Sequence, residues 1–312
     1  MDKNVILVTG ACGQIGSELV ASLRERNIDV LATDIRKNKE EHGPFEVLDV
    51  LDSQRLASLI DQYGVTQIYH LAAILSANGE KNPVWAWNIN MTGLLNILET
   101  SVSKGIQKVF YPSTIAVFGS TTPKEMTPQF TVTEPGTIYG ISKLAGERWC
   151  AWYAKNKGLD VRSLRYPGLI SYKTKAGGGT TDYAVDIFFD AVEKQHYHCF
   201  LREDTCLPMM YMPDAIRATI ALMEAPVESI NHQLSYNIAG VSFTPAELTQ
   251  EIKKHIPDFR VTYNPDFRQS IADTWPHSID DQLAKMHWGW NPEFTLKHMT
   301  ADMIQQIKNN SL

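Results

Sequence analysis

Three glycines near the N-terminus constrain this chain more than any other feature. Gly10, Gly13 and Gly16 follow an apolar run, Val5–Thr9, which has the composition of a β-strand. They also open an amphipathic pattern of helical period, Gln14–Arg26. A glycine turn between a strand and a helix lets a pyrophosphate approach the backbone and the N–H groups of the helix N-terminus. We therefore expect this turn to bind a dinucleotide.

Asp34 lies at the end of the second apolar run, Val30–Ala32, and completes the expected dinucleotide site. A carboxylate at this place accepts hydrogen bonds from the adenosine ribose and repels a 2′-phosphate, so we expect NAD as the cofactor rather than NADP. Arg36 keeps NADP open as an alternative, because an arginine beside this strand end can bind the additional phosphate.

Strands and helices alternate through the first half of the chain. This order predicts an α/β fold with a doubly wound parallel sheet of the Rossmann type. We expect residues 1–168 to form the NAD-binding domain, joined by parts of 205–240, and residues 169–312 to form a smaller C-terminal substrate-binding region. Further strands are expected at Phe45–Leu48, Ile68–Ala73, Val109–Pro112 and Val161–Arg165, and helices at Ser53–Gln62, Pro83–Ser103, Tyr139–Asn156, Asp182–Lys194, Pro213–Met223 and Pro245–His255, with irregular connections from about Ile256.

Tyr139 and Lys143 are the candidate catalytic pair. Their i, i+4 spacing places them on one face of a helix. A free tyrosine has a pKa near 10, and a neighbouring ammonium is expected to lower it, so that the phenolate can act as a base. Ser113 and Thr114 follow a predicted strand, where either hydroxyl could hold the reacting oxygen. This arrangement predicts oxidation of a secondary alcohol by hydride transfer, and the scheme requires no metal.

Composition narrows the functional classes further. The formal net charge is −6, and Lys and Arg are spread along the chain, so we expect no nucleic-acid partner and no membrane surface as partner. The sequence begins with a strand rather than a signal peptide, which favours a cytoplasmic location. The four cysteines are dispersed and form no CxxC pair, so we predict neither a disulfide scaffold nor a metal site.

The GxxGxxG spacing resembles the extended branch of the short-chain dehydrogenases/reductases. Over the whole chain the sequence resembles the short-chain, metal-independent L-threonine 3-dehydrogenases. That resemblance implies oxidation of L-threonine at Cβ to 2-amino-3-oxobutanoate, with release of NADH. It also implies a homodimer that pairs helices 83–103 and 139–156 across a two-fold axis. The segments that carry it are Gly10–Gly16, Leu71–Ser76, Pro112–Ile115, Leu164–Gly168, Gly179–Tyr183, Leu207–Asp214 and Thr274–Pro276.

The resemblance also assigns residues to the two ligands. For the cofactor it implies Gly10, Gly13, Gln14, Ile15, Gly16, Asp34, Arg36, Asp49, Val50, Leu71, Ala72, Ala73, Asn90, Tyr139, Lys143, Tyr166 and Pro167. For the substrate it implies Ser76, Ser113, Thr114, Tyr139, Thr180, Thr181 and Trp275.

Several alternatives remain open on the sequence alone. Thr181 or Asp182 could simply cap a helix, and Trp275 could be a buried core aromatic. The glycines 177–179 could close a loop over the substrate or serve only as a linker. A nucleotide-sugar epimerase or dehydratase shares the glycine turn and the Tyr/Lys pair. A non-catalytic NAD sensor is a third possibility, although such proteins often lose the Tyr or the Lys.

Overall fold

The computed structural model describes residues 4–37, 43–173, 177–232 and 235–310. Its main feature is a seven-stranded parallel sheet with the order β10-β6-β5-β4-β1-β2-β3. The strand order reverses between β1 and β4, which is where ligands bind in doubly wound sheets. The predicted Rossmann fold is confirmed. The strands are β1 (Val5–Thr9), β2 (Asp29–Asp34), β3 (Phe45–Val47), β4 (Val65–His70), β5 (Lys108–Thr114), β6 (Asp160–Tyr166) and β10 (Ser235–Asn237).

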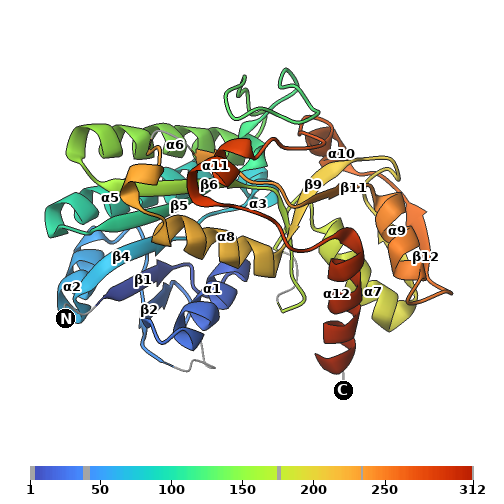
Figure 1. The fold of residues 1–312 in the computed structure, drawn as a ribbon, viewed down its shortest axis with the longest axis horizontal. Helices are drawn as coiled ribbons and strands as arrows, with labels where there is room; N and C mark the ends of the chain where they lie inside the picture. Colours follow the sequence, from blue (N-terminus) through green and yellow to red (C-terminus); the bar gives the residue numbers. More distant parts are fainter. Residues whose placement is uncertain (1–3, 38–42, 174–176, 233–234, 311–312) are drawn as a thin grey trace.

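Helices cover both faces of this sheet (Figure 1). Parallel strands that are buried on both sides are apolar at successive positions, and β1 shows this clearly. Ile6 and Val8 pack into the core beneath α1 and α8, while Val5 and Leu7 pack into the core beneath α2, α5 and α6. The helices span α1 (Gln14–Glu25), α2 (Ser53–Tyr63), α5 (Gly93–Lys104), α6 (Ile138–Lys157) and α8 (Met212–Glu224).

The helix predicted at Pro83–Ser103 is one helical rod with an interruption. It consists of α4 (Pro83–Trp87), a π-helical turn η1 (Asn88–Thr92) and α5. The backbone stays helical through the junctions. A π turn changes the direction of the side chains locally and is frequent at functional sites. Here it buries Asn90 beside the loop that follows β4.

A smaller part is built onto the carboxyl ends of the large sheet (Figure 1). One sheet pairs β7 (Gly168–Ile170), β9 (Leu207–Tyr211) and β11 (Val241–Phe243), and a second pairs β8 (His196–Cys199) with β12 (Arg260–Tyr263). Around them pack α7 (Tyr183–Lys194), α9 (Pro245–Lys253) and α12 (Leu296–Asn310), whose buried side chains share one core.

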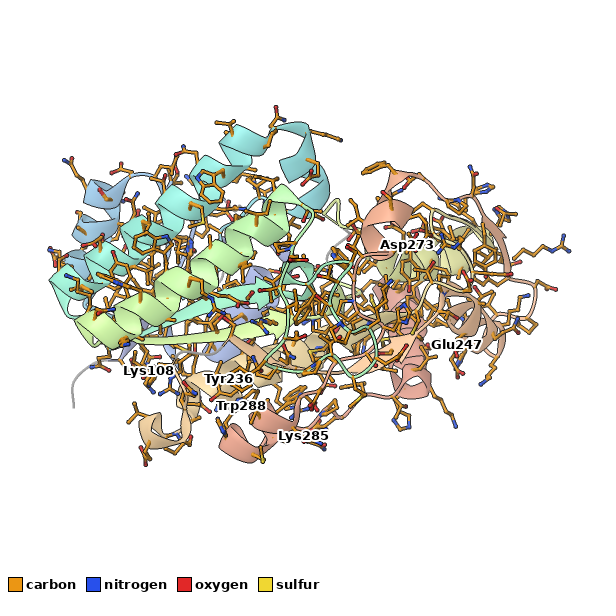
Figure 2. The ribbon with its side chains drawn as sticks, turned by 90° about the horizontal axis from the view of Figure 1, so that it is seen from above. Lys108, Tyr236, Glu247, Asp273, Lys285 and Trp288 are labelled. Carbon is orange, nitrogen blue, oxygen red and sulfur yellow. The ribbon has the colours of Figure 1, made fainter. Side chains whose placement is uncertain are left out.

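The expectation of irregular connections from about Ile256 is wrong. Besides β12, this segment forms α10 (Phe267–Ala272), α11 (Gln282–Trp288) and the long α12. Met299, Met303 and Ile307 lie at helical spacing along α12 and are buried, so the periodic signal was present. The segment also returns to the large sheet, where Tyr236 of β10 contacts Trp288 with ring centroids 6.1 Å apart (Figure 2).

Candidate active site

A cavity of about 240 Å³ lies where β1, β4, β5 and β6 end. The carboxyl ends of parallel strands meet at one edge of a sheet, and this edge is the usual ligand site of the fold. Predicted residues that line the cavity are Gly10, Gly13, Gln14, Ile15, Gly16, Leu71, Ala73, Ser76, Ser113, Thr114, Tyr139, Lys143, Tyr166, Pro167, Thr180, Thr181 and Trp275.

The glycine turn has the conformation that a close backbone approach needs. Gly10 has φ +68°, in the left-handed region, and a Cβ there would lie 2.7 Å from the Ala72 nitrogen. A Cβ on Gly16 would lie 2.3 Å from the Gly10 carbonyl oxygen. Among the described residues no side chain caps the first turn of α1. Its N–H groups are therefore positioned to bind an anionic group.

Asp34 is buried beside this turn, with 7 % of its surface exposed. Its Oδ2 accepts a hydrogen bond from the Cys12 backbone at 3.1 Å, and its Oδ1 accepts one from the Arg36 backbone at 3.1 Å. The Arg36 side chain is largely exposed, and its Nε lies 3.7 Å from Asp34 Oδ1. The carboxylate is thus held rigidly at the strand end, where it favours a ribose with both hydroxyls over one that carries a phosphate.

Four other predicted cofactor residues lie outside the cavity lining. Asp49 is exposed and accepts a hydrogen bond from the Leu51 backbone. Val50 packs beneath Gly93, and Ala72 packs against Gly10. Asn90 binds the loop after β4 through two hydrogen bonds: its Oδ1 accepts from the Ile74 backbone N–H at 2.8 Å, and its Nδ2 donates to the Ile74 carbonyl at 3.1 Å. Its Nδ2 also donates to Ser142 Oγ at 3.1 Å.

Two buried polar atoms that point to ligands belong to lining residues. Gln14 Nε2 and Thr180 Oγ1 have no hydrogen-bond partner within the described part of the chain. An unsatisfied buried donor or acceptor is costly, and native proteins rarely tolerate one. Gln14 lies in the glycine turn, so its amide fits a bound dinucleotide. Thr180 lines the cavity from the loop before α7, where its hydroxyl suits a polar substrate.

Tyr139 and Lys143 lie in the first turns of α6, as their spacing predicts. Thr137 caps this helix by accepting a hydrogen bond from the Gly140 backbone at 3.1 Å. Lys143 is 4 % exposed, and its Nζ donates to the Pro112 carbonyl at 2.7 Å. The same nitrogen lies 5.7 Å from the centre of the Tyr139 ring.

Burial governs the ionisation of this pair. It raises the pKa of Tyr139 to about 12, and a hydrogen bond with Thr114 acts in the opposite direction. It lowers the pKa of Lys143 to about 8. The sequence predicts that the ammonium lowers the Tyr139 pKa, and the structure shows the reverse direction. The reason is that removing the phenolate from water costs more free energy than the hydrogen bond with Thr114 recovers.

The structure gives the two candidate hydroxyls different partners. Ser113 is 2 % exposed, and its Oγ donates to Glu147 Oε1 at 2.5 Å, away from Tyr139. Thr114 forms the hydrogen bond with Tyr139 and also accepts from the Ala116 backbone at 3.2 Å. The hydroxyl that meets the base is therefore that of Thr114.

The loop before α7 forms part of the cavity wall. Asp182 is the N-cap residue of α7, yet its side chain does not cap the helix. Instead its Oδ2 accepts from the backbones of Gly178 and Gly179, at 2.7 and 2.5 Å. Burial raises the pKa of this carboxyl, and the glycine N–H groups act against that rise. Trp275 is 5 % exposed, packs in the core of the smaller part and also lines the cavity, so both of its expected roles are compatible with its position.

Sequence reasoning missed seven lining residues. Most lie directly next to a predicted site residue in the sequence, so only the tertiary fold distinguishes them. The seven are Leu75, Pro112, Ile115, Gly168, Leu169, Gly179 and Asp182.

Across the described ranges, no three His, Cys, Asp or Glu side chains gather to hold a metal ion. No helix there is long and apolar enough to cross a membrane.

A second hollow, of about 450 Å³, lies on the outer surface between α1 and α8. Two pairs of its charged residues contact each other, Arg26 with Glu224 at 2.8 Å and Lys173 with Glu18 at 3.7 Å. None of the predicted catalytic residues lines it, so the chemistry is assigned to the smaller cavity.

Comparison with known proteins agrees with the site. The model of the NAD-dependent epimerase/dehydratase family matches residues 6–239. An uncharacterized epimerase/dehydratase of Staphylococcus haemolyticus is 46% identical, with 97% of each chain covered. A GalE-like L-threonine dehydrogenase from Cupriavidus necator, in its holo form, is 56% identical with a TM-score of 0.95, covering 97% of this chain and 99% of that one. A monomeric L-threonine 3-dehydrogenase from a metagenome database is 50% identical with a TM-score of 0.96, covering 98% and 100%.

Proposed function

The chain belongs to the NAD-dependent epimerase/dehydratase family, and on that premise we propose that it oxidises the Cβ hydroxyl of L-threonine with NAD. The products are 2-amino-3-oxobutanoate and NADH. One observation carries the proposal: Tyr139, its partner Thr114 and the unsatisfied Thr180 hydroxyl line one small cavity beside the glycine turn. The similarity to two L-threonine dehydrogenases at 50% identity or more supports the choice of substrate.

Each catalytic residue has a distinct task. Tyr139 removes the proton of the Cβ hydroxyl, and Thr114 donates a hydrogen bond to the reacting oxygen as it becomes a carbonyl. Lys143 favours the phenolate and would hold the nicotinamide ribose of the bound cofactor. NAD, when bound, accepts the hydride from Cβ at C4 of its nicotinamide ring. The glycine turn, Gln14 and Asp34 would hold the dinucleotide.

Threonine is a small zwitterion that carries one methyl group, and the remaining wall suits it. Thr180, Thr181 and Ser76 offer hydroxyls for the carboxylate, and Asp182 supplies negative charge for the ammonium. Trp275 closes the apolar side.

A spectrophotometric assay tests the proposal. Purified protein is mixed with NAD, a chelator and either L-threonine or a UDP-sugar. Absorbance at 340 nm follows NADH, and chromatography follows the UDP-sugar, because epimerisation has no net release of NADH. We expect NADH to accumulate with L-threonine despite the chelator. Turnover of the UDP-sugar without any oxidation of threonine would contradict the assignment and favour the epimerase alternative.

We also propose that the protein is a homodimer through helices 83–103 and 139–156. Large apolar side chains on these helices are exposed in the single chain, at 50 % for Trp85, 41 % for Trp149 and 45 % for Trp152. Large exposed apolar side chains on two neighbouring helices favour an interface there. One similar dehydrogenase is described as monomeric, and the mass in solution distinguishes the two states. Light scattering at micromolar concentration should give twice the chain mass, and Trp152→Glu should reduce it; a monomeric wild type would contradict the proposal.

A further inference from the structure

The Lys143 ammonium is buried, which is unusual for a charged group. It is 4 % exposed, and within the described ranges no carboxylate forms an ion pair with it. Its Nζ contacts the Pro112 carbonyl at 2.7 Å and lies 4.7 Å from the centre of the Tyr111 ring. A buried lysine without such compensation loses its proton. The groups that keep Lys143 charged therefore contribute to catalysis.

The position of Tyr111 is fixed from two sides. It lies on β5 and is 3 % exposed, on the face of the sheet that packs against α6. Its hydroxyl donates to the Lys143 carbonyl at 3.5 Å. A Cβ on Gly146 would lie 2.1 Å from that hydroxyl, so the glycine makes the space that the ring occupies. The fold thereby brings an aromatic face over the Lys143 ammonium.

We propose that Tyr111 is a positioning residue for Lys143: the face of its ring holds the ammonium charged and directed toward Tyr139. An aromatic face attracts a cation most strongly where water is excluded, and this site is buried. The inference rests on the proposed function, because it assigns the effect to the base that oxidises the substrate alcohol.

Other titratable groups lie near the ammonium on β4 and α6. His70 lies at the carboxyl end of β4, the strand beside β5, and burial lowers its pKa to about 3, so it brings no charge. Cys150 of α6 stays a thiol, because burial raises its pKa. Glu147, one turn after Lys143, is bound to Arg165 by two contacts of 2.8 Å. Tyr111 is therefore the neighbour whose change acts most directly on Lys143.

The pH dependence of kcat/KM reports on the contact between the Tyr111 ring and the Lys143 ammonium. The active form combines the Tyr139 phenolate with the Lys143 ammonium, and it holds the same number of protons as the form with a neutral pair. With pKa values of about 12 and about 8, the active fraction rises with pH up to about 8 and is level above it. A weaker attraction between the Tyr111 ring and the ammonium lowers the Lys143 pKa. The break in the profile, which is the pH at which the active fraction becomes level, then moves to lower pH, and the plateau falls by the same factor. Rates below the break stay unchanged.

A series of isosteric side chains tests the proposal. Tyr111→Phe keeps the ring, and di- and trifluorinated phenylalanine at position 111 keep its shape while they weaken the negative face. The value of kcat/KM for NAD, which follows the ionisation of the free enzyme, is measured from pH 6 to 10. Trifluorophenylalanine at Phe110 is the matched control, because that ring lies on the other face of β5.

We expect Tyr111→Phe to keep the break of the wild type. Fluorination should move the break down by up to about one pH unit and lower the plateau about tenfold. The control at Phe110 should leave the break in place. An identical break across the whole series at position 111, with normal folding, would overturn the proposal.

A second readout is independent of turnover. In protein labelled with ε-¹³C lysine, the Lys143 signal is assigned by its loss in Lys143→Arg and is titrated without substrate. Its pKa should fall along the fluorinated series. If threonine is not oxidised but this pKa falls, the proposed substrate is wrong and the role of Tyr111 stands. If threonine is oxidised but this pKa is constant, the role of Tyr111 is wrong.

Discussion

Thr114→Val separates the two hydroxyls that the sequence leaves equivalent. Valine keeps the shape of threonine and removes the hydroxyl that hydrogen-bonds Tyr139. The parallel change is Ser113→Ala, which removes the donor at 2.5 Å from Glu147 and leaves Tyr139 untouched. The structure therefore predicts that the first change lowers catalysis and the second lowers stability.

The expected magnitudes follow from these contacts. Loss of one donor to a reacting oxygen typically lowers kcat about 10²–10³-fold, so Thr114→Val should fall in that range. It also removes the acceptor for the Ala116 backbone, which costs about 1 kcal/mol of stability. After Ser113→Ala, Glu147 keeps both Arg165 contacts and loses one donor, so the free energy of unfolding should fall by about 1–3 kcal/mol. Its kcat/KM should stay within a few-fold of wild type.

The assay combines initial rates of NADH formation at saturating NAD with thermal unfolding of each variant. Thr114→Ser is the control, because it restores the hydroxyl, and it should recover most of the activity. A loss of about 10²-fold in kcat/KM for Ser113→Ala with unchanged stability, while Thr114→Val kept most of its rate, would refute the assignment of the two hydroxyls.

Three further predictions follow from the same contacts. Asp34→Ala should reduce the preference for NAD over NADP at least about tenfold, because the buried carboxylate that repels a 2′-phosphate is gone; an unchanged ratio of kcat/KM for the two cofactors would count against its role. Glu147→Gln should lower the free energy of unfolding by about 3–5 kcal/mol, since it leaves the buried Arg165 without its counter-charge, whereas the double change Glu147→Leu, Arg165→Leu should cost less in denaturant titrations. For wild-type protein, kcat/KM for NAD should rise about tenfold per pH unit to about pH 8 and level above it, because burial raises the Tyr139 pKa and lowers that of Lys143; a decline over that range would argue against the two directions.

Local patterns allowed the correct prediction of the features that depend on a short stretch of chain. The glycine turn needs only a strand, three glycines and a helix, and Tyr139 with Lys143 needs only one helical turn. Both are therefore visible in the sequence. The strand and helix order of the first half is predictable for the same reason, because each element carries its own period.

Features that depend on distant segments could not be predicted in this way. Ser113 and Thr114 are neighbours with the same chemistry, and only the packing of α6 against β5 decides which one meets Tyr139. Tyr111 has the composition of an ordinary strand residue until Gly146 brings α6 over it. The Tyr139 pKa was expected to fall, because the spacing shows the ammonium and does not show the cost of burial.

Isotope transfer from threonine tests the central claim most directly. L-Threonine that carries deuterium at Cβ is incubated with the protein and NAD, and the NADH formed is analysed by mass spectrometry and NMR. A hydride transfer from Cβ beside Tyr139 predicts one deuterium at C4 of the dihydronicotinamide ring, with 2-amino-3-oxobutanoate as the other product. NADH without deuterium, or the label released to water, would contradict the account.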